Sequence, residues 1–70
     1  MKKFVIKSFG FEKEFFAKTK EKAALAYINL FLDIIPRNFY IVDTEQQKIF
    51  YVALDDTLKF SFEEFAVVSI

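Results

Sequence analysis

Pairs of carboxylates are the groups in this sequence that come closest to a catalytic or metal-binding pattern. Glu12 and Glu14 stand two residues apart, a spacing that puts both on one face of a strand. Paired carboxylates can do acid–base chemistry or bind a hard cation. These two lie among lysines, without a second cluster of ligands, so we interpret them as solvated surface residues. The pairs at 55–56 and 63–64 are adjacent in sequence, and adjacent strand residues point to opposite faces.

The other residue types that usually carry chemistry are scarce. The chain contains no histidine and no cysteine, which removes the usual general base, the commonest metal ligands and any disulfide framework. One glycine cannot build a phosphate-binding loop of the glycine-rich kind. We therefore expect a protein that is not an enzyme and that has no metal site, no cofactor and no small-molecule substrate.

The composition points instead to apolar surface in excess. Seventy residues fit a single domain spanning 1–70, yet 54% of them are hydrophobic and 20% are aromatic. A domain this small buries only about 60% of the surface that its unfolded chain exposes. Some of the apolar surface is therefore expected outside the core, in an interface with another protein.

The apolar stretches are too short for a signal peptide or a membrane span. Lys7 and Ser8 interrupt the first run, and Asn29 and Asp33 interrupt the longest run at 23–35. A span needs about 20 residues. Because the chain also lacks cysteine, we expect a cytoplasmic protein with no membrane partner.

The first half predicts a hairpin followed by a helix. Two strands rich in β-forming residues flank Gly10, with the loop at 9–10 or at 10–11. Thr19 is a predicted helix N-cap, and the helix is expected to end near Asp33 because Pro36 disfavours helical geometry before it. The helix is apolar around more than one side, so it is either largely enclosed or contacts something along its Leu25 and Leu32 edge.

The second half predicts more strands. Residues 39–43 and 48–54 flank a polar loop and form a second hairpin. Residues 58–62 and 65–70 predict one or two further strands, with a helical turn at 61–64 as an alternative because Ser61 and Glu64 have capping-box spacing. The expected fold class is α+β: a small, mainly antiparallel sheet curled around one helix. Its elements follow in the order strand, strand, helix, strand, strand, strand, and the final segment could supply a sixth strand.

Alternation along these strands predicts a second apolar surface on the side of the sheet away from the helix. A sheet with one wet face should alternate apolar and polar residues, but both hairpins carry apolar residues on both faces. The candidate partner-binding residues are Val5, Phe9, Phe16, Tyr40, Val42, Ile49 and Tyr51. Either the sheet buries them by curling, or another protein covers them. A second copy of the chain is the simplest such protein, and a sheet edge that accepts an added strand is a further option.

A nucleic-acid surface is the alternative. Residues 1–22 hold seven lysines and three glutamates, and single-strand binders combine positive charge with stacking aromatic rings. The candidate residues are Lys3, Lys7, Lys18, Lys20 and Lys22, with Phe9 and Phe16 as the stacking rings. Against it, the chain is neutral with an isoelectric point near 6.2, whereas such domains usually exceed about 9.

The functional expectation is therefore a small, non-enzymatic protein–protein interaction module. It would self-associate and act by binding and occluding a larger protein. The sequence favours residues encoded by AT-rich codons, as in many low-GC bacteria and their phages, and small accessory or inhibitor proteins of phages and mobile elements act in this way. Single-stranded nucleic-acid binding remains the alternative.

Overall fold

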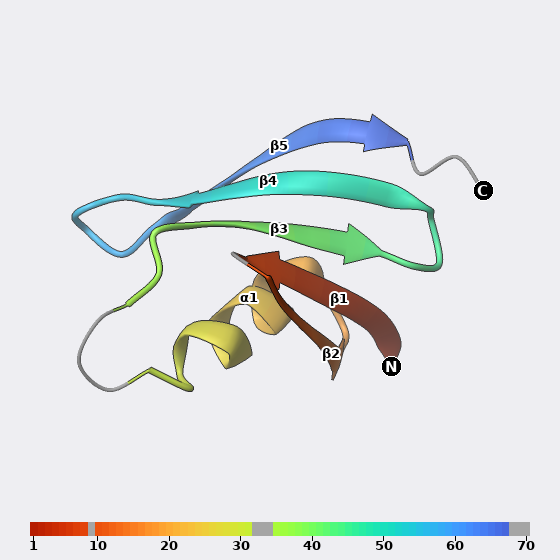
Figure 1. Ribbon diagram of the computed structural model, residues 1–70, viewed down its shortest axis with the longest axis horizontal. Helices are drawn as coiled ribbons and strands as arrows, with labels where there is room; N and C mark the ends of the chain where they lie inside the picture. The colour runs from red at the N-terminus through yellow and green to blue at the C-terminus, as the bar shows by residue number, and fades with distance from the viewer. Residues whose placement is uncertain (9, 32–34, 68–70) are drawn as a thin grey trace.

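The fold is an antiparallel sheet of five strands with one helix against it (Figure 1). The computed structural model describes residues 1–8, 10–31 and 35–67, with the side chains of the last two left aside. The elements are β1 (Lys2–Ser8), β2 (Phe11–Ala17), α1 (Lys20–Ile28), β3 (Asn38–Asp43), β4 (Lys48–Leu54) and β5 (Phe60–Val67). The strands lie in the order β2-β1-β3-β4-β5, and every neighbouring pair is antiparallel. The predicted α+β class and antiparallel sheet are confirmed.

The β1–β2 hairpin closes over residues 9 and 10. Ser8 pairs with Phe11 across the strands, so the first of the two predicted loops is the one formed. Gly10 has a φ of 77°, in the left-handed region that costs glycine little and other residues more. The same register sets Lys7 opposite Glu12.

Helix α1 begins as predicted but ends earlier. The Thr19 hydroxyl accepts a hydrogen bond from the Lys22 N–H at 3.2 Å, as an N-cap does. The predicted end near Asp33, which lies outside the described residues, was too late because the helix stops at Ile28. The N–H groups of Leu30 and Phe31 donate to the carbonyls of Tyr27 and Ile28, only three residues back, which tightens the last turn and ends the helix.

The β3–β4 hairpin has the predicted register. Asp43 lies opposite Lys48, and Tyr40 lies opposite Tyr51, with residues 44–47 as the loop. The helical turn considered at 61–64 is wrong, and so is the separate sixth strand within the described residues, because β5 runs from Phe60 to Val67. The pairing with β4 shifts by one residue there and leaves Phe65 as the extra residue of a β-bulge.

The core lies between α1 and one face of the sheet. Its buried residues are Phe4, Ile6, Ala17, Ala23, Ala24, Tyr27, Ile28, Phe39, Ile41, Val52 and Leu54. Tyr27 is the centre of this layer, with its ring 4.8 Å from that of Phe39 and 5.8 Å from that of Phe11. Helix α1 packs on β2, β1 and β3, and Figure 1 shows it below β3, β4 and β5. The helix is not enclosed, since Leu25 on its outer side is 49% exposed.

Candidate functional site: an open sheet face

The side of the sheet opposite α1 forms a continuous surface that we call the open face. Strand pairing aligns its side chains in rows across the sheet, because directly paired residues point to the same side. One row runs Glu12, Lys7, Tyr40, Tyr51, Glu63 from β2 to β5. The next row contains Glu14, Val5, Val42 and Ile49 over the first four strands. Phe16 pairs with Lys3 beyond that row.

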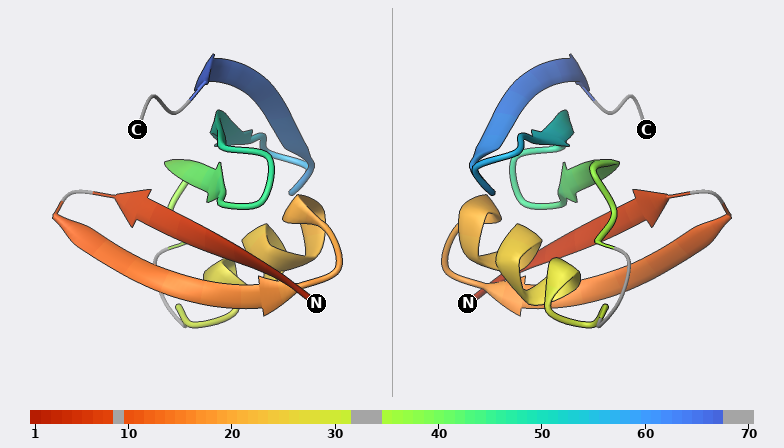
Figure 2. Two further views of the ribbon diagram at one scale, coloured as in Figure 1. Left: turned by 90° about the vertical axis from the view of Figure 1, so that its right-hand side faces the viewer. Right: turned by 90° about the vertical axis from the view of Figure 1, so that its left-hand side faces the viewer.

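The structure brings six of the seven predicted partner-binding residues onto this open face. Phe16 and Tyr40 are 64% and 39% exposed, and the remaining four (Val5, Val42, Ile49, Tyr51) are partly buried. The seventh, Phe9, lies outside the described residues. In the part of the chain that the structure describes, no element packs over this face. Figure 2 shows β3, β4 and β5 on one side of the molecule and the helix on the other.

Phe65 is an open-face residue that the sequence analysis missed. It is 65% exposed, and its ring lies 5.6 Å from that of Tyr40, which in turn lies 5.4 Å from that of Tyr51. Phe65 is the extra residue of the bulge in β5. If residues 61–65 are treated as one continuous strand instead of a capped helical turn, alternation places Phe65 on the same face as Glu63, which is the open face. This alternation is the sequence signal that was missed.

Two ion pairs lie on the β1–β2 part of the open face. Lys7 Nζ lies 3.6 Å from Glu12, and Lys3 Nζ lies 3.5 Å from Glu14. Each glutamate of the i,i+2 pair therefore faces a lysine, and both side chains are well exposed. Among the described residues, no three potential ligands gather around a point where a metal could sit.

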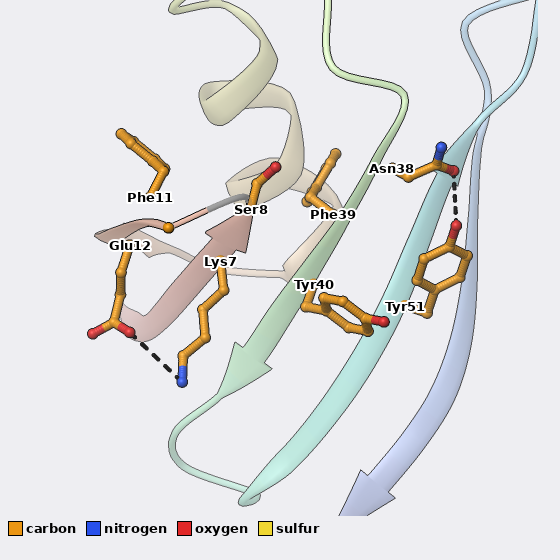
Figure 3. Close-up of a pocket in the computed structure, with 9 residues that line it drawn as sticks. Lys7, Ser8, Phe11, Glu12, Asn38, Phe39, Tyr40 and Tyr51 are labelled. Carbon is orange, nitrogen blue, oxygen red and sulfur yellow. Dashed lines mark hydrogen bonds and ion pairs between the residues drawn. The ribbon is translucent and has the colours of Figure 1, made fainter.

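A hollow of about 540 Å³ lies at one end of the sheet, between the open face and the helix side (Figure 3). It forms where β1 and β3 diverge, since their pairing ends at Lys7 and Tyr40. Phe11 and Phe39 contribute aromatic walls, and Tyr51 is held at the rim by a 2.9 Å hydrogen bond from its hydroxyl to Asn38 Oδ1. Phe39 is buried in the core and Phe11 lies against Tyr27, so these two walls belong to the helix side of the sheet, whereas Tyr40 and Tyr51 belong to the open face.

The lysines predicted for nucleic-acid binding do not form one surface. Lys3 and Lys7 lie on the open face beside their glutamates, whereas Lys18, Lys20 and Lys22 lie around the start of α1. Lys20 lies 3.4 Å from Glu21 and also lies over the rings of two phenylalanines on the helix side. A track for a phosphate backbone needs a continuous positive groove, and this geometry divides the positive charge between two sides.

The two outer strands of the sheet carry features that discourage strand addition. The exposed edge of β2 has Glu12, Lys13 and Glu14 in succession, and β5 has the bulge next to Glu63 and Glu64. Charges and bulges on edge strands oppose pairing with another strand. The geometry favours the open face over either edge as the contact surface.

The fold and surface define a class: an α+β protein whose antiparallel sheet is covered by a helix on one face and open on the other. Comparison with known proteins found no matching family model, no matching curated protein and no matching solved structure. None of the helices within the described residues has the length and apolar character needed to cross a membrane. The function is therefore argued from the geometry of this chain.

Proposed function

We propose that the chain is a non-enzymatic protein–protein interaction module whose open face self-associates. Its action is to bind and cover a functional surface of a larger protein, as small accessory and inhibitor proteins of phages and bacteria do. One observation carries the proposal: three aromatic side chains, Phe16, Tyr40 and Phe65, are each more than a third exposed on one sheet face. Aromatic residues are enriched at the centre of protein interfaces.

The alternative explanation for an apolar sheet face is internal burial. Among the described residues, no element packs over the open face. Phe16, Tyr40 and Phe65 stay more than a third exposed there, which supports burial against another protein surface rather than inside the chain.

The proposal is preferred over single-stranded nucleic-acid binding because of the lysine positions. Two of the five candidate lysines, Lys3 and Lys7, are neutralised on the open face by adjacent glutamates. Binding to single strands would be strongly salt-dependent. A gel shift in low salt is therefore expected to show no complex with single-stranded DNA or RNA, and a salt-sensitive complex would favour the alternative.

Sedimentation equilibrium of three purified proteins tests the proposal. Phe65→Asp places a charge on the open face, and Leu58→Asp is its matched control. Leu58 is 60% exposed against 65% for Phe65 but lies in the turn between β4 and β5. The wild-type chain and Leu58→Asp should associate with rising concentration, whereas Phe65→Asp should stay monomeric with the same circular dichroism. A monomeric wild type at every concentration, or a Phe65→Asp variant that associates normally, would contradict the proposal.

A further inference from the structure

We infer that the open face recognises an arginine side chain of the larger protein, through three neighbouring aromatic rings and one free carboxylate. This inference rests on the proposed function and names the chemistry of the partner. The rings belong to Tyr40, Tyr51 and Phe65, which we call the aromatic cluster. The ring centroid of Tyr40 lies 5.4 Å from that of Tyr51 and 5.6 Å from that of Phe65. The carboxylate is that of Glu63.

The rings of the aromatic cluster leave part of their faces open. Tyr40 and Phe65 are 39% and 65% exposed, and Tyr51 is partly buried. The planes of Tyr40 and Tyr51 are tilted by 58°, and those of Tyr40 and Phe65 by 57°, so these rings do not cover each other as parallel stacked rings do. A cation within about 6 Å of the centroid of a ring is attracted by the negative charge of its face. The cluster is therefore a surface on which a cation can lie.

The chain's own lysines lie over other rings. The ammonium groups of Lys2, Lys13 and Lys20 lie 5.0–5.8 Å from the centroids of phenylalanine rings in or against the core, on the helix side. Within the part of the chain that the structure describes, no cation takes such a position over the aromatic cluster. Lys7, in the same row of the open face, is paired with Glu12 at 3.6 Å. The cluster thus receives no cation from its own chain.

Glu63 adds negative charge beside the aromatic cluster. It lies opposite Tyr51 across β4 and β5, and it is exposed. None of the ion pairs between described residues includes it. Glu12 and Glu14, the other glutamates in the rows of the open face, both have lysine partners. The free negative charge of this face therefore lies next to the three rings, which makes the site complementary to a cation.

Arginine of another protein fits this site better than lysine or a second copy of the chain. A planar guanidinium stacks on aromatic rings and pairs with a carboxylate through two parallel N–H bonds, which an ammonium group cannot do. Arginine is also enriched in protein interfaces. Arg37 is the only arginine of this chain, and its Nη1 already lies 2.9 Å from Asp56 Oδ1. The larger protein is therefore the expected source of the arginine.

A nuclear magnetic resonance titration with N-acetyl-arginine methylamide as the probe tests the inference. The citrulline counterpart, in which a neutral urea group replaces the guanidinium, is the matched control, and the lysine counterpart is a second comparison. The protein is kept dilute, where the proposed function expects monomers, and the ionic strength is held constant. The arginine probe should shift the ring signals of the aromatic cluster with a dissociation constant on the order of 10 mM, since each exposed cation–ring contact contributes about two- to fivefold in affinity. The citrulline probe should leave these signals nearly unchanged.

Two neighbouring glutamates provide a matched pair of variants. Glu63→Gln removes the free carboxylate and should weaken binding of the arginine probe about two- to fivefold. Glu64→Gln changes the next residue, whose carboxylate lies on the helix side 3.5 Å from Lys48 Nζ, and should leave binding unchanged. Phe65→Leu keeps an apolar side chain but removes the ring, and it should weaken binding by a similar factor to Glu63→Gln.

The possible results separate this inference from the proposed function. Equal shifts with the arginine and citrulline probes, or equal binding by Glu63→Gln and Glu64→Gln, would overturn this inference and leave the proposed function standing. A lysine probe that binds as tightly as the arginine probe would overturn the assignment to arginine. A wild type that stays monomeric at every concentration in sedimentation equilibrium would contradict the proposed function and this inference with it, even where the arginine probe binds.

Discussion

Replacement of Asp43 should destabilise the fold more than replacement of any exposed aspartate. Asp43 is 4% exposed and ends β3. Its Oδ2 accepts from Lys2 Nζ at 3.2 Å, and its Oδ1 accepts from the N–H groups of Glu45 and Gln46 at 3.0 and 3.1 Å. One side chain thus ties the start of β1 to the β3–β4 loop.

The magnitude follows from what each variant leaves behind. Hydrogen bonds to charged groups contribute about 1.5–3 kcal/mol each, but the loop N–H groups released by Asp43→Ala can reach water. We expect a loss of about 2–3 kcal/mol for Asp43→Ala. Asp43→Asn retains an acceptor for the two N–H groups and loses mainly the ion pair with Lys2, about 1 kcal/mol. As the control, Asp56→Ala removes the exposed pair with Arg37 and should cost less than about 0.5 kcal/mol.

The pH dependence gives the prediction a second readout. Burial by itself raises the pKa of Asp43, but the hydrogen bonds from Gln46, Lys2 and Glu45 outweigh it and hold the pKa below its ordinary value. A carboxyl whose pKa is lower in the folded state stabilises the fold above its unfolded pKa and loses that effect as the pH falls through its folded pKa. The stability advantage of the wild type over Asp43→Asn should therefore shrink below about pH 4.

Urea denaturation at neutral pH and in a series toward pH 2 measures both effects. If Asp43→Ala costs no more than Asp56→Ala at neutral pH, the network around Asp43 does not stabilise the fold as described. If the difference between wild type and Asp43→Asn grows toward low pH, the sign of the pKa shift is wrong.

Three further substitutions test other parts of the structure by the same denaturation assay. Tyr27→Ala removes the ring at the centre of the core and should cost about 3–5 kcal/mol, enough to unfold a domain this small; a folded variant would contradict that central position. Thr19→Ala removes the N-cap of α1 and should cost about 1 kcal/mol, whereas Thr19→Ser should cost little; equal losses for the two would rule out the cap. Gly10→Ala should cost about 1 kcal/mol through its φ of 77° alone, since an added Cβ meets nothing within 4 Å, and an unchanged stability would indicate another hairpin turn.

The sequence was informative where the signal was local. The sequence of the second hairpin predicted the pairing of Asp43 with Lys48. The polar four-residue loop between two apolar strands fixes which residues lie opposite each other. Thr19 was recognised because capping depends on the next three residues alone. Alternation along the strands of the two hairpins also assigned Phe16 and Tyr40 to the side of the sheet away from the helix.

The errors arose where tertiary structure decides between local alternatives. Periodicity continues past Ile28, but the last turn tightens and the helix ends there, five residues before the predicted end. Capping-box spacing at Ser61 was a valid local signal that the pairing of β5 with β4 overrode. The order of the strands and the hollow between β1 and β3 depend on contacts between distant segments, so neither could be read from the sequence.

The most direct test of the central claim, that the open face is an association surface, is the mass of the protein in solution as a function of concentration. Sedimentation equilibrium from low micromolar to millimolar protein should show the wild type moving from the 8.3 kDa monomer to a dimer. The combined variant Phe16→Asp/Phe65→Asp should remain a folded monomer throughout. A wild type that stays at the monomer mass over the whole range, or a combined variant that dimerises as the wild type does, would contradict the claim.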